Sequence, residues 1–347
     1  SQKAELLLES LSSSIELERV RGLLGMYANA LAGSEVELQA VGELTHKNIG
    51  WVSMELATTD GRNVFLPAMV DQHESKEDNF SWLKVVTTHQ VGHIEFESFD
   101  FDFEAEAARF EDLRSKVADG IGAERGSTDV ASFFDIFPVR GLAADVFSVV
   151  EDARVDANLL ERYKGLTAHY RKVQRDTLAS RPSIHTMPAQ QAMVELLIRM
   201  SLHQTGDTTV PTQYLEQAKE IAALLRQVQD PEATVEDTAE ATLRIYHMIS
   251  QIANEEIPPD DWEQADLSET EFTEPDVKSI VENFQQQMDE QEGEEGEGGE
   301  EYESPEDVEY RGDFKPEMVQ MLSKMRGQQG GDDQDGDDMT EGLTQEE

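Results

Sequence analysis

The stretch His89-Gln90-Val91-Gly92-His93 is the part of this sequence that most constrains the fold. On a helix, residues four positions apart share one face, so the imidazoles of His89 and His93 can reach the same metal ion. Some sixty residues later, Glu151-Asp152-Ala153-Arg154 lies in a second segment with helical periodicity. A carboxylate from that segment can supply a third ligand and leave a fourth position for water. Together, the two stretches predict a metal site built on two helices.

Two neighbouring carboxylates compete for the place of the third ligand. We favour Glu151 because glutamate has the longer reach, and we keep Asp152 as the alternative. Arg154 is interpreted as an outer residue that holds a carboxylate in place, and Asp156 as one that orients a histidine. The sequence has no cysteine, so histidine and carboxylate must bind the metal, and zinc is the expected ion. The alternative is a pair of buried, hydrogen-bonded histidines beside an Arg154 salt bridge.

Gln90 occupies the position at which thermolysin-like zinc peptidases have a glutamate that acts as general base. A glutamine amide has no titratable oxygen near neutral pH, so it cannot take a proton from bound water. Three interpretations remain open: a natural site that binds metal without hydrolysis, an engineered Glu-to-Gln change, or another base such as Glu95 or Glu97. Glu95 points away from the ligand face if the helix continues past His93. We favour the natural, non-hydrolytic interpretation.

The charge of the chain is strongly negative and unevenly distributed. Its formal net charge is -45, and the region from Glu255 to the end contains 33 acidic and 5 basic residues. Such a surface repels phosphate backbones, which argues against nucleic acid and anionic membranes as partners. No apolar run approaches the roughly 20 residues of a membrane span, and the N-terminus carries no signal pattern. We therefore expect a soluble, cytoplasmic protein.

Residues 1–254 are expected to form a mostly helical, zincin-like domain of the α+β class, with one small antiparallel sheet at about residues 35–70. Asp60-Gly61 between two apolar runs predicts a hairpin in that sheet. Ser75 is suited to cap the helix that carries the metal motif. Residues 96–103 alternate between apolar and polar, which predicts a strand or an extended segment. Helical spacing of apolar residues predicts further helices at 3–32, 104–119, 142–163, 166–181, 188–205, 211–229 and 232–254.

Residues 255–347 are expected to form an acidic linker and a disordered tail. Their Glu- and Gly-rich stretches offer too little apolar surface to offset the entropy lost on ordering. A short amphipathic helix at about residues 315–326 interrupts this pattern. Methionine-rich faces adapt to their targets, so we interpret this helix as partner-binding, through Met318, Met321, Leu322 and Met325. A partly helical tail that packs on nothing is the alternative.

Four stretches carry a family resemblance through their order and spacing. They are Asp60-Gly61-Arg62-Asn63-Val64-Phe65-Leu66-Pro67-Ala68, His89-Gln90-Val91-Gly92-His93-Ile94-Glu95-Phe96, Val150-Glu151-Asp152-Ala153-Arg154-Val155-Asp156 and Val308-Glu309-Tyr310-Arg311-Gly312-Asp313-Phe314. Together they resemble the N-terminal region of the NorD/CbbO family and the segment that follows the acidic linker in those proteins. In that resemblance, Glu151 occupies the ligand-like position of a Glu-Asp-x-Arg pattern.

The resemblance implies an adaptor or activator subunit that works with a MoxR-type AAA+ ATPase on a client metalloenzyme. Clients in the family include nitric oxide reductase and Rubisco. Family members usually end in a von Willebrand factor A domain with an Asp-x-Ser-x-Ser metal site, and we find no such motif after a predicted buried strand here. We therefore expect a chaperone-like adaptor with a metal-binding, non-hydrolytic site. A zinc-dependent metallopeptidase is the alternative function, and a chaperone that inserts a metal into a client is a third.

Overall fold

The computed structural model describes residues 12–42, 56–202, 206, 208–293 and 301–332. It is mainly α-helical with short strands, which confirms the predicted α+β class. The α-helices are α2 (Leu17–Ala32), α4 (Lys76–Glu95), α5 (Arg114–Ile121), α6 (Asp129–Phe134), α7 (Arg140–Arg162), α8 (Thr167–Ser180), α9 (Ala189–Ser201), α10 (Leu215–Val228), α11 (Val235–Ser250), α12 (Val277–Gly293) and α13 (Pro316–Asp332). The strands are β1 (Ile15–Glu16), β2 (Glu37–Ala40), β3 (Thr58–Thr59), β4 (Asn63–Leu66), β5 (Met69–Val70), β6 (Thr208–Pro211) and β7 (Trp262–Ala265), and the 3₁₀ turns are η1 (Lys164–Leu166), η2 (Ile184–Thr186) and η3 (Thr212–Tyr214).

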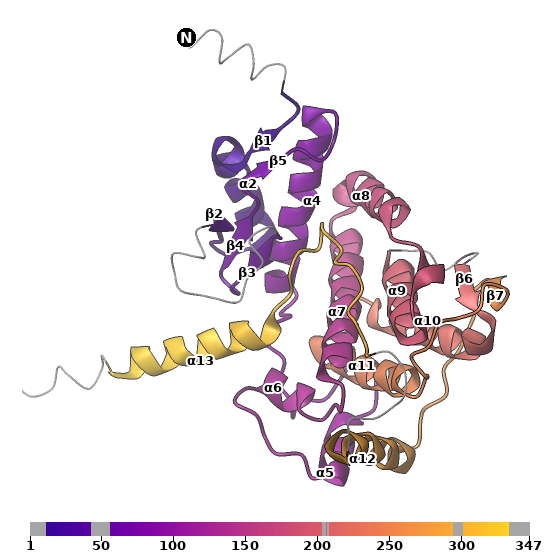
Figure 1. Cartoon of the computed structure of the whole chain (residues 1–347). Helices are drawn as coiled ribbons and strands as arrows, with labels where there is room; N and C mark the ends of the chain where they lie inside the picture. Colours follow the sequence, from indigo (N-terminus) through magenta and orange to yellow (C-terminus); the bar gives the residue numbers. More distant parts are fainter. Residues whose placement is uncertain (1–11, 43–55, 203–205, 207, 294–300, 333–347) are drawn as a thin grey trace, which may run out of the picture.

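The N-terminal half of the fold consists of α2, α4 and two small β elements (Figure 1). α2 ends at Gly33, whose φ of 63° lies in the left-handed region that glycine adopts without strain. This confirms the predicted stop of the first helix. Its predicted start lies outside the described residues, and the two-residue strand β1 directly precedes α2 and pairs with β5.

The small sheet has the strand order β2-β4-β3. β3 and β4 are antiparallel, and Asp60 closes their turn by accepting the backbone N–H groups of Arg62 and Asn63, so the predicted hairpin is confirmed. β2 pairs with β4 in parallel, which corrects the expectation of a purely antiparallel sheet. Alternating periodicity shows which residues share a face, but it does not determine the direction of a neighbouring strand. β3 forms one edge of the sheet.

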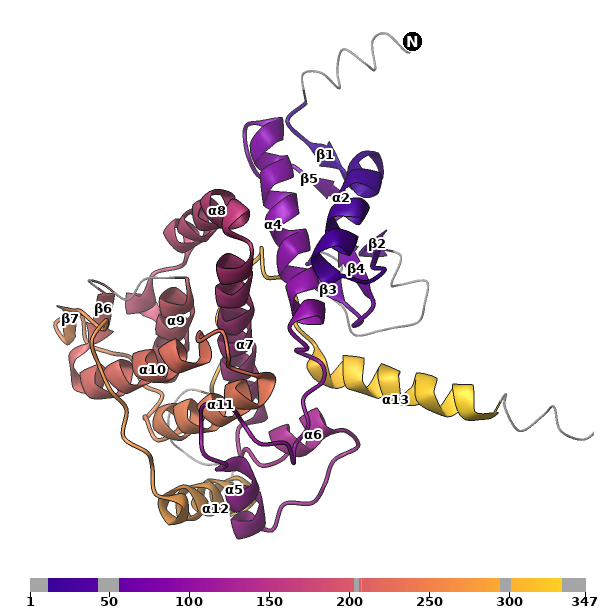
Figure 2. The same cartoon turned by 180° about the vertical axis from the view of Figure 1, so that it is seen from behind.

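α4 carries the metal motif and packs between α2 on one side and α7 on the other (Figures 1 and 2). Its first turn is capped by Ser75, whose hydroxyl accepts the Asp78 backbone N–H at 3.0 Å, as the sequence predicts. At Gly92 a Cβ atom would lie 2.7 Å from Val155 Cγ1 and 2.9 Å from Leu159 Cδ1. The glycine therefore allows α4 to approach α7 closely beside the two histidines.

The C-terminal half is a helical assembly around α7, against which α9, α10 and α11 pack (Figure 1). α7, α8, α9, α10 and α11 confirm the five predicted helices between residues 142 and 254; α7 begins two residues earlier than predicted, and the other four are shorter. Their apolar faces form one buried core together with residues of α2 and α4. α7 therefore lies where the two halves of the fold meet.

The segment between α4 and α5 contains neither the expected strand nor most of the expected helix. Residues 96–103 form turns and irregular chain, and the helix found in place of the predicted 104–119 covers only Arg114–Ile121. Asp237 on α11 accepts the backbone N–H groups of residues 108–110, and Glu240 accepts that of Leu113. These carboxylates take the hydrogen bonds that a local helix would otherwise form.

The acidic region after residue 254 is ordered over the described ranges 255–293 and 301–332, which corrects the expectation of a disordered tail there. β7 pairs with β6, and α12 packs on α5. Leu267, Ile280, Phe284 and Tyr310 are fully buried. A few well-placed apolar residues in an acidic sequence therefore suffice to attach it to the body. α13 extends beyond the predicted 315–326. None of the described helices is long and apolar enough to cross a membrane.

Candidate metal centre

Three buried side chains from two helices meet where α4 crosses α7. His89 and His93 come from α4, and Asp152 comes from α7. His89 Nε2 lies 3.2 Å from His93 Nε2 and 3.2 Å from Asp152 Oδ1, and His93 Nε2 lies 3.3 Å from the same oxygen. Both histidines are fully buried, and the Asp152 side chain is 12% exposed. This group can hold a metal ion through one atom from each residue.

Glu151, the favoured third ligand, does not join the two histidines. Its carboxylate accepts hydrogen bonds from Arg154 Nη2 at 2.6 Å, Thr238 Oγ1 at 2.6 Å and Ser98 Oγ at 2.5 Å. Successive residues of a helix are about 100° apart, so Glu151 and Asp152 face different neighbours, and only Asp152 faces α4. The structure thus favours the alternative ligand, while Arg154 holds a carboxylate as predicted.

Asp156 orients His89, in agreement with its predicted outer role. Asp156 Oδ1 lies 2.8 Å from His89 Nδ1 and accepts the Tyr170 hydroxyl at 2.5 Å. Its other oxygen accepts the Tyr310 hydroxyl at 2.6 Å and Arg311 Nη2 at 2.8 Å. These contacts fix the ring so that Nε2 faces Asp152 and His93.

Ser98 orients His93, and sequence reasoning did not identify it. Its Oγ lies 3.0 Å from His93 Nδ1 and donates to Glu151. The turn after α4 places Ser98 there, through a left-handed residue at Glu97 with a φ of 58°. A serine five residues after a histidine has no periodicity that would mark it, so only the fold shows this contact.

The electrostatics of the cluster favour a cation at its centre. Burial lowers the pKa of His89, but the charges and hydrogen bonds of Asp156 and Asp152 outweigh it and raise that pKa to about 9. Burial and the neighbouring His89 lower the pKa of His93. Burial raises the pKa of Asp152, yet hydrogen bonds from both histidines bring it down to about 2. Metal binding deprotonates histidine ligands, so a divalent cation can replace the proton that these aspartates stabilise.

Gln90, at the general-base position, is held away from this chemistry. Its side-chain Nε2 donates to the Arg311 carbonyl oxygen at 2.5 Å. Neither alternative carboxylate is among these atoms: Glu95 contacts the Tyr163 hydroxyl at 2.8 Å and pairs with Arg162 at the C-terminal end of α7, and Glu97 is exposed. None of the three residues considered as a base lies among the metal-binding atoms.

Residues 308–314 cross the metal centre, and we call this segment the strap. In Figures 1 and 2 the chain that precedes α13 runs between α4 and α7. Tyr310 and Arg311 of the strap are buried, and its Phe314 ring stacks on His93 with centroids 4.4 Å apart and planes 11° apart. A cavity of about 300 Å³ beside the strap, lined also by α7 and α9, includes Asp152 in its wall.

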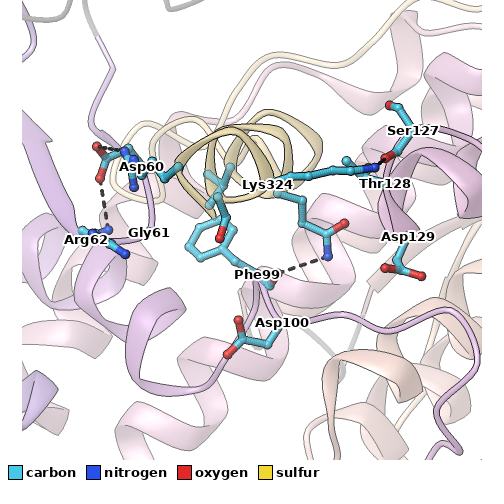
Figure 3. Close-up of a pocket in the computed structure, with 13 residues that line it drawn as sticks. Asp60, Gly61, Arg62, Phe99, Asp100, Ser127, Thr128, Asp129 and Lys324 are labelled. Carbon is cyan, nitrogen blue, oxygen red and sulfur yellow. Dashed lines mark hydrogen bonds and ion pairs between the residues drawn. The ribbon is translucent and has the colours of Figure 1, made fainter. Parts of the chain in front are cut away.

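The residues predicted to bind a partner lie on α13, outside the metal centre. Met321 and Met325 are 44% and 53% exposed, while Met318 and Leu322 are partly buried. The opposite side of α13 is attached to the body through Val319, which is buried, and Gln320, which donates to the Phe101 carbonyl oxygen. Figure 3 shows the pocket of about 470 Å³ along this attached side, between the turn at residues 60–62 and residues 127–129.

No protein-family model matches this chain, and comparison with curated proteins and with solved structures finds no significant similarity. The resemblance to the NorD/CbbO family therefore stays a prediction from the four motifs that carry it. The metal centre is interpreted from its own geometry.

Proposed function

We propose that this chain is a non-hydrolytic zinc-binding adaptor. The triangle formed by the three ligand atoms, with sides of 3.2, 3.2 and 3.3 Å, supports the metal part of the proposal. Tetrahedral zinc with bonds of about 2.0–2.1 Å requires its ligand atoms to be about 3.3–3.4 Å apart. Two imidazoles and one carboxylate, each imidazole fixed by an outer hydrogen bond, form a ligand set that suits zinc.

We attribute the absence of hydrolysis to Gln90 together with the strap, and Gln90 is the residue that carries the proposal. A peptidase at this centre needs a carboxylate beside the bound water, and an amide cannot accept its proton. The Gln90 amide also donates to the strap, whose Phe314 ring stacks on the ligand His93. Zinc would then join α4 to α7 and stabilise the junction of the two halves.

The adaptor part of the proposal names a MoxR-type AAA+ ATPase as partner and a metalloenzyme as client. It is supported by the four-motif resemblance to NorD/CbbO proteins and by the exposed methionines Met321 and Met325 on α13. Flexible, polarisable methionine side chains suit a helix that adapts to a partner surface.

Elemental analysis of protein purified without a metal-affinity tag tests the metal centre. We expect about one zinc per chain in the wild type, and none in the His89→Ala, His93→Ala double variant or in Asp152→Asn. The matched control is the His169→Ala, His185→Ala variant, which removes two exposed histidines and keeps its zinc. Equal metal in all four proteins, or none in the wild type, contradicts the proposed centre.

A further inference from the structure

The strap is held in a groove whose wall is the edge of the small sheet. β3 is the edge strand, and the strap lies parallel to it through a bridge between Thr58 and Asp313. Asp313 N–H donates to the Ala57 carbonyl oxygen at 2.7 Å, and the Thr58 hydroxyl donates to the Asp313 carbonyl oxygen at 2.8 Å. Residues 308–312 form a turn, closed by the Arg311 and Gly312 N–H groups, and only Asp313 then pairs with the sheet edge. Main-chain pairing with a sheet edge is a common mode of peptide recognition.

The groove requires a glycine in its occupant. Gly312 has a φ of 71°, and a Cβ atom there would lie 2.2 Å from the Ala57 carbonyl oxygen and 2.8 Å from Gln90 Nε2. The Gln90 side-chain amide donates a hydrogen bond to the preceding carbonyl oxygen, that of Arg311. The backbone therefore forms hydrogen bonds on both sides of Gly312, at a position where only glycine fits.

Side-chain pockets on either side of that glycine give the groove its specificity. The Arg311 guanidinium is 1% exposed, and it donates to Asp156 Oδ2 at 2.8 Å and to Ser201 Oγ at 2.8 Å. The Phe314 ring lies on His93 and parallel to Phe147 at 6.2 Å. Arginine and phenylalanine of the strap thus bind to residues of the body.

We propose that this groove is a peptide-binding site for Arg-Gly-x-Phe segments that turn at the glycine, and that the strap is its resident occupant. A partner or client segment with the same pattern occupies the groove when the strap is released. The buried acceptor Asp156 requires the arginine, the close backbone of Ala57 requires the glycine, and the ring of His93 requires the phenylalanine. This inference rests on the proposed adaptor function, and its contacts at Phe314 and Arg311 adjoin His93 and Asp156, so the test includes the zinc content.

The test uses the full-length chain with the strap loosened by Gly312→Ala. The probe is a fluorescein-labelled peptide of residues 305–317, measured by fluorescence anisotropy. The matched control is Gly122→Ala, which has a similar φ of 69° but nothing within 4 Å of the new Cβ atom. We expect the peptide to bind Gly312→Ala and to leave the wild type and Gly122→Ala unbound. Faster hydrogen exchange at residues 308–314 in Gly312→Ala reports the loosening itself.

The peptide carries its own specificity control. Replacing its arginine with alanine leaves the buried Asp156 without its partner, so binding to the Gly312→Ala protein should weaken about 100-fold or more. Equal binding of the two peptides, equal binding to all three proteins, or no binding to a chain whose strap exchanges faster each overturns the proposal. An unchanged exchange rate in Gly312→Ala overturns it as well.

Phe314→Ala provides a second route if Gly312→Ala loses its helical circular dichroism. This variant removes the stacking on His93 without adding an atom, and it should bind the same peptide while the wild type does not. Failure of a folded Phe314→Ala chain with a loosened strap to bind overturns the proposal. Zinc content is measured on the same samples, so a lost peptide site is distinguished from a lost metal centre.

Discussion

At the scale of single residues, the direction in which each side chain points separates roles that look equivalent in the sequence. Glu151 and Asp152 are adjacent carboxylates, yet one is saturated by Arg154, Thr238 and Ser98, and the other faces the histidines. Gln90 differs from glutamate by one amide group, and the nitrogen of that group donates to the Arg311 carbonyl oxygen. Each assignment therefore depends on a hydrogen bond between residues far apart in the chain.

Replacing Gln90 with glutamate tests its role. In Gln90→Glu a buried carboxylate faces the Arg311 carbonyl oxygen without a donor, so unfolding in urea should show a loss of about 1–3 kcal/mol. We expect no cleavage of an unfolded protein substrate, because the strap still covers the centre. Gln213→Glu, at an exposed position of η3, is the control and should leave stability unchanged. Chelator-sensitive cleavage by Gln90→Glu would instead identify a peptidase site.

At the scale of helices and strands, close approach of α4 and α7 positions the ligands. A Cβ atom at Gly92 would overlap Val155 and Leu159, and such overpacking costs about 1–3 kcal/mol, more than the ~1 kcal/mol that alanine gains in helix propensity. Gly92→Ala should therefore lower the free energy of unfolding in urea. Gly22→Ala, in α2 with nothing within 4 Å of its Cβ atom, should raise it. A rise in the free energy of unfolding for Gly92→Ala would mean that α4 can move away from α7.

α13 is the element expected to contact the ATPase. Met321→Ser with Met325→Ser removes the exposed methionines without touching Val319 and Gln320, which attach the helix. We expect this variant to lose co-purification with a MoxR-type AAA+ ATPase while its melting temperature stays within about 2 °C. Leu23→Ser with Met26→Ser, on exposed positions of α2, is the control and should still co-purify. Loss in the control alone would move the docking site to α2.

At the scale of the whole molecule, the His89, His93 and Asp152 cluster lies where the two halves of the fold meet, and a metal bound there would join them. Metal that binds only the folded chain stabilises it by about 2.7 kcal/mol at a hundredfold excess over Kd, which corresponds to several degrees in Tm. A chelator should lower the Tm of the wild type by that amount and leave that of the His89→Ala, His93→Ala variant unchanged. An equal shift in both proteins would show that the chelator acts elsewhere, for example on the acidic surface.

The sequence by itself determined what depends on near neighbours along the chain. The helix stop at Gly33, the cap at Ser75, the hairpin at Asp60-Gly61 and the shared face of His89 and His93 all follow from local periodicity and backbone preference. Only the tertiary structure decided whether Glu151 or Asp152 faces α4, because packing sets how α7 is rotated about its axis relative to α4. It also decided that residues 108–113 bond to α11, that β2 runs parallel to β4, and that the strap crosses the metal centre. These features join residues that are far apart in the chain, and their contacts leave no periodic pattern in the sequence.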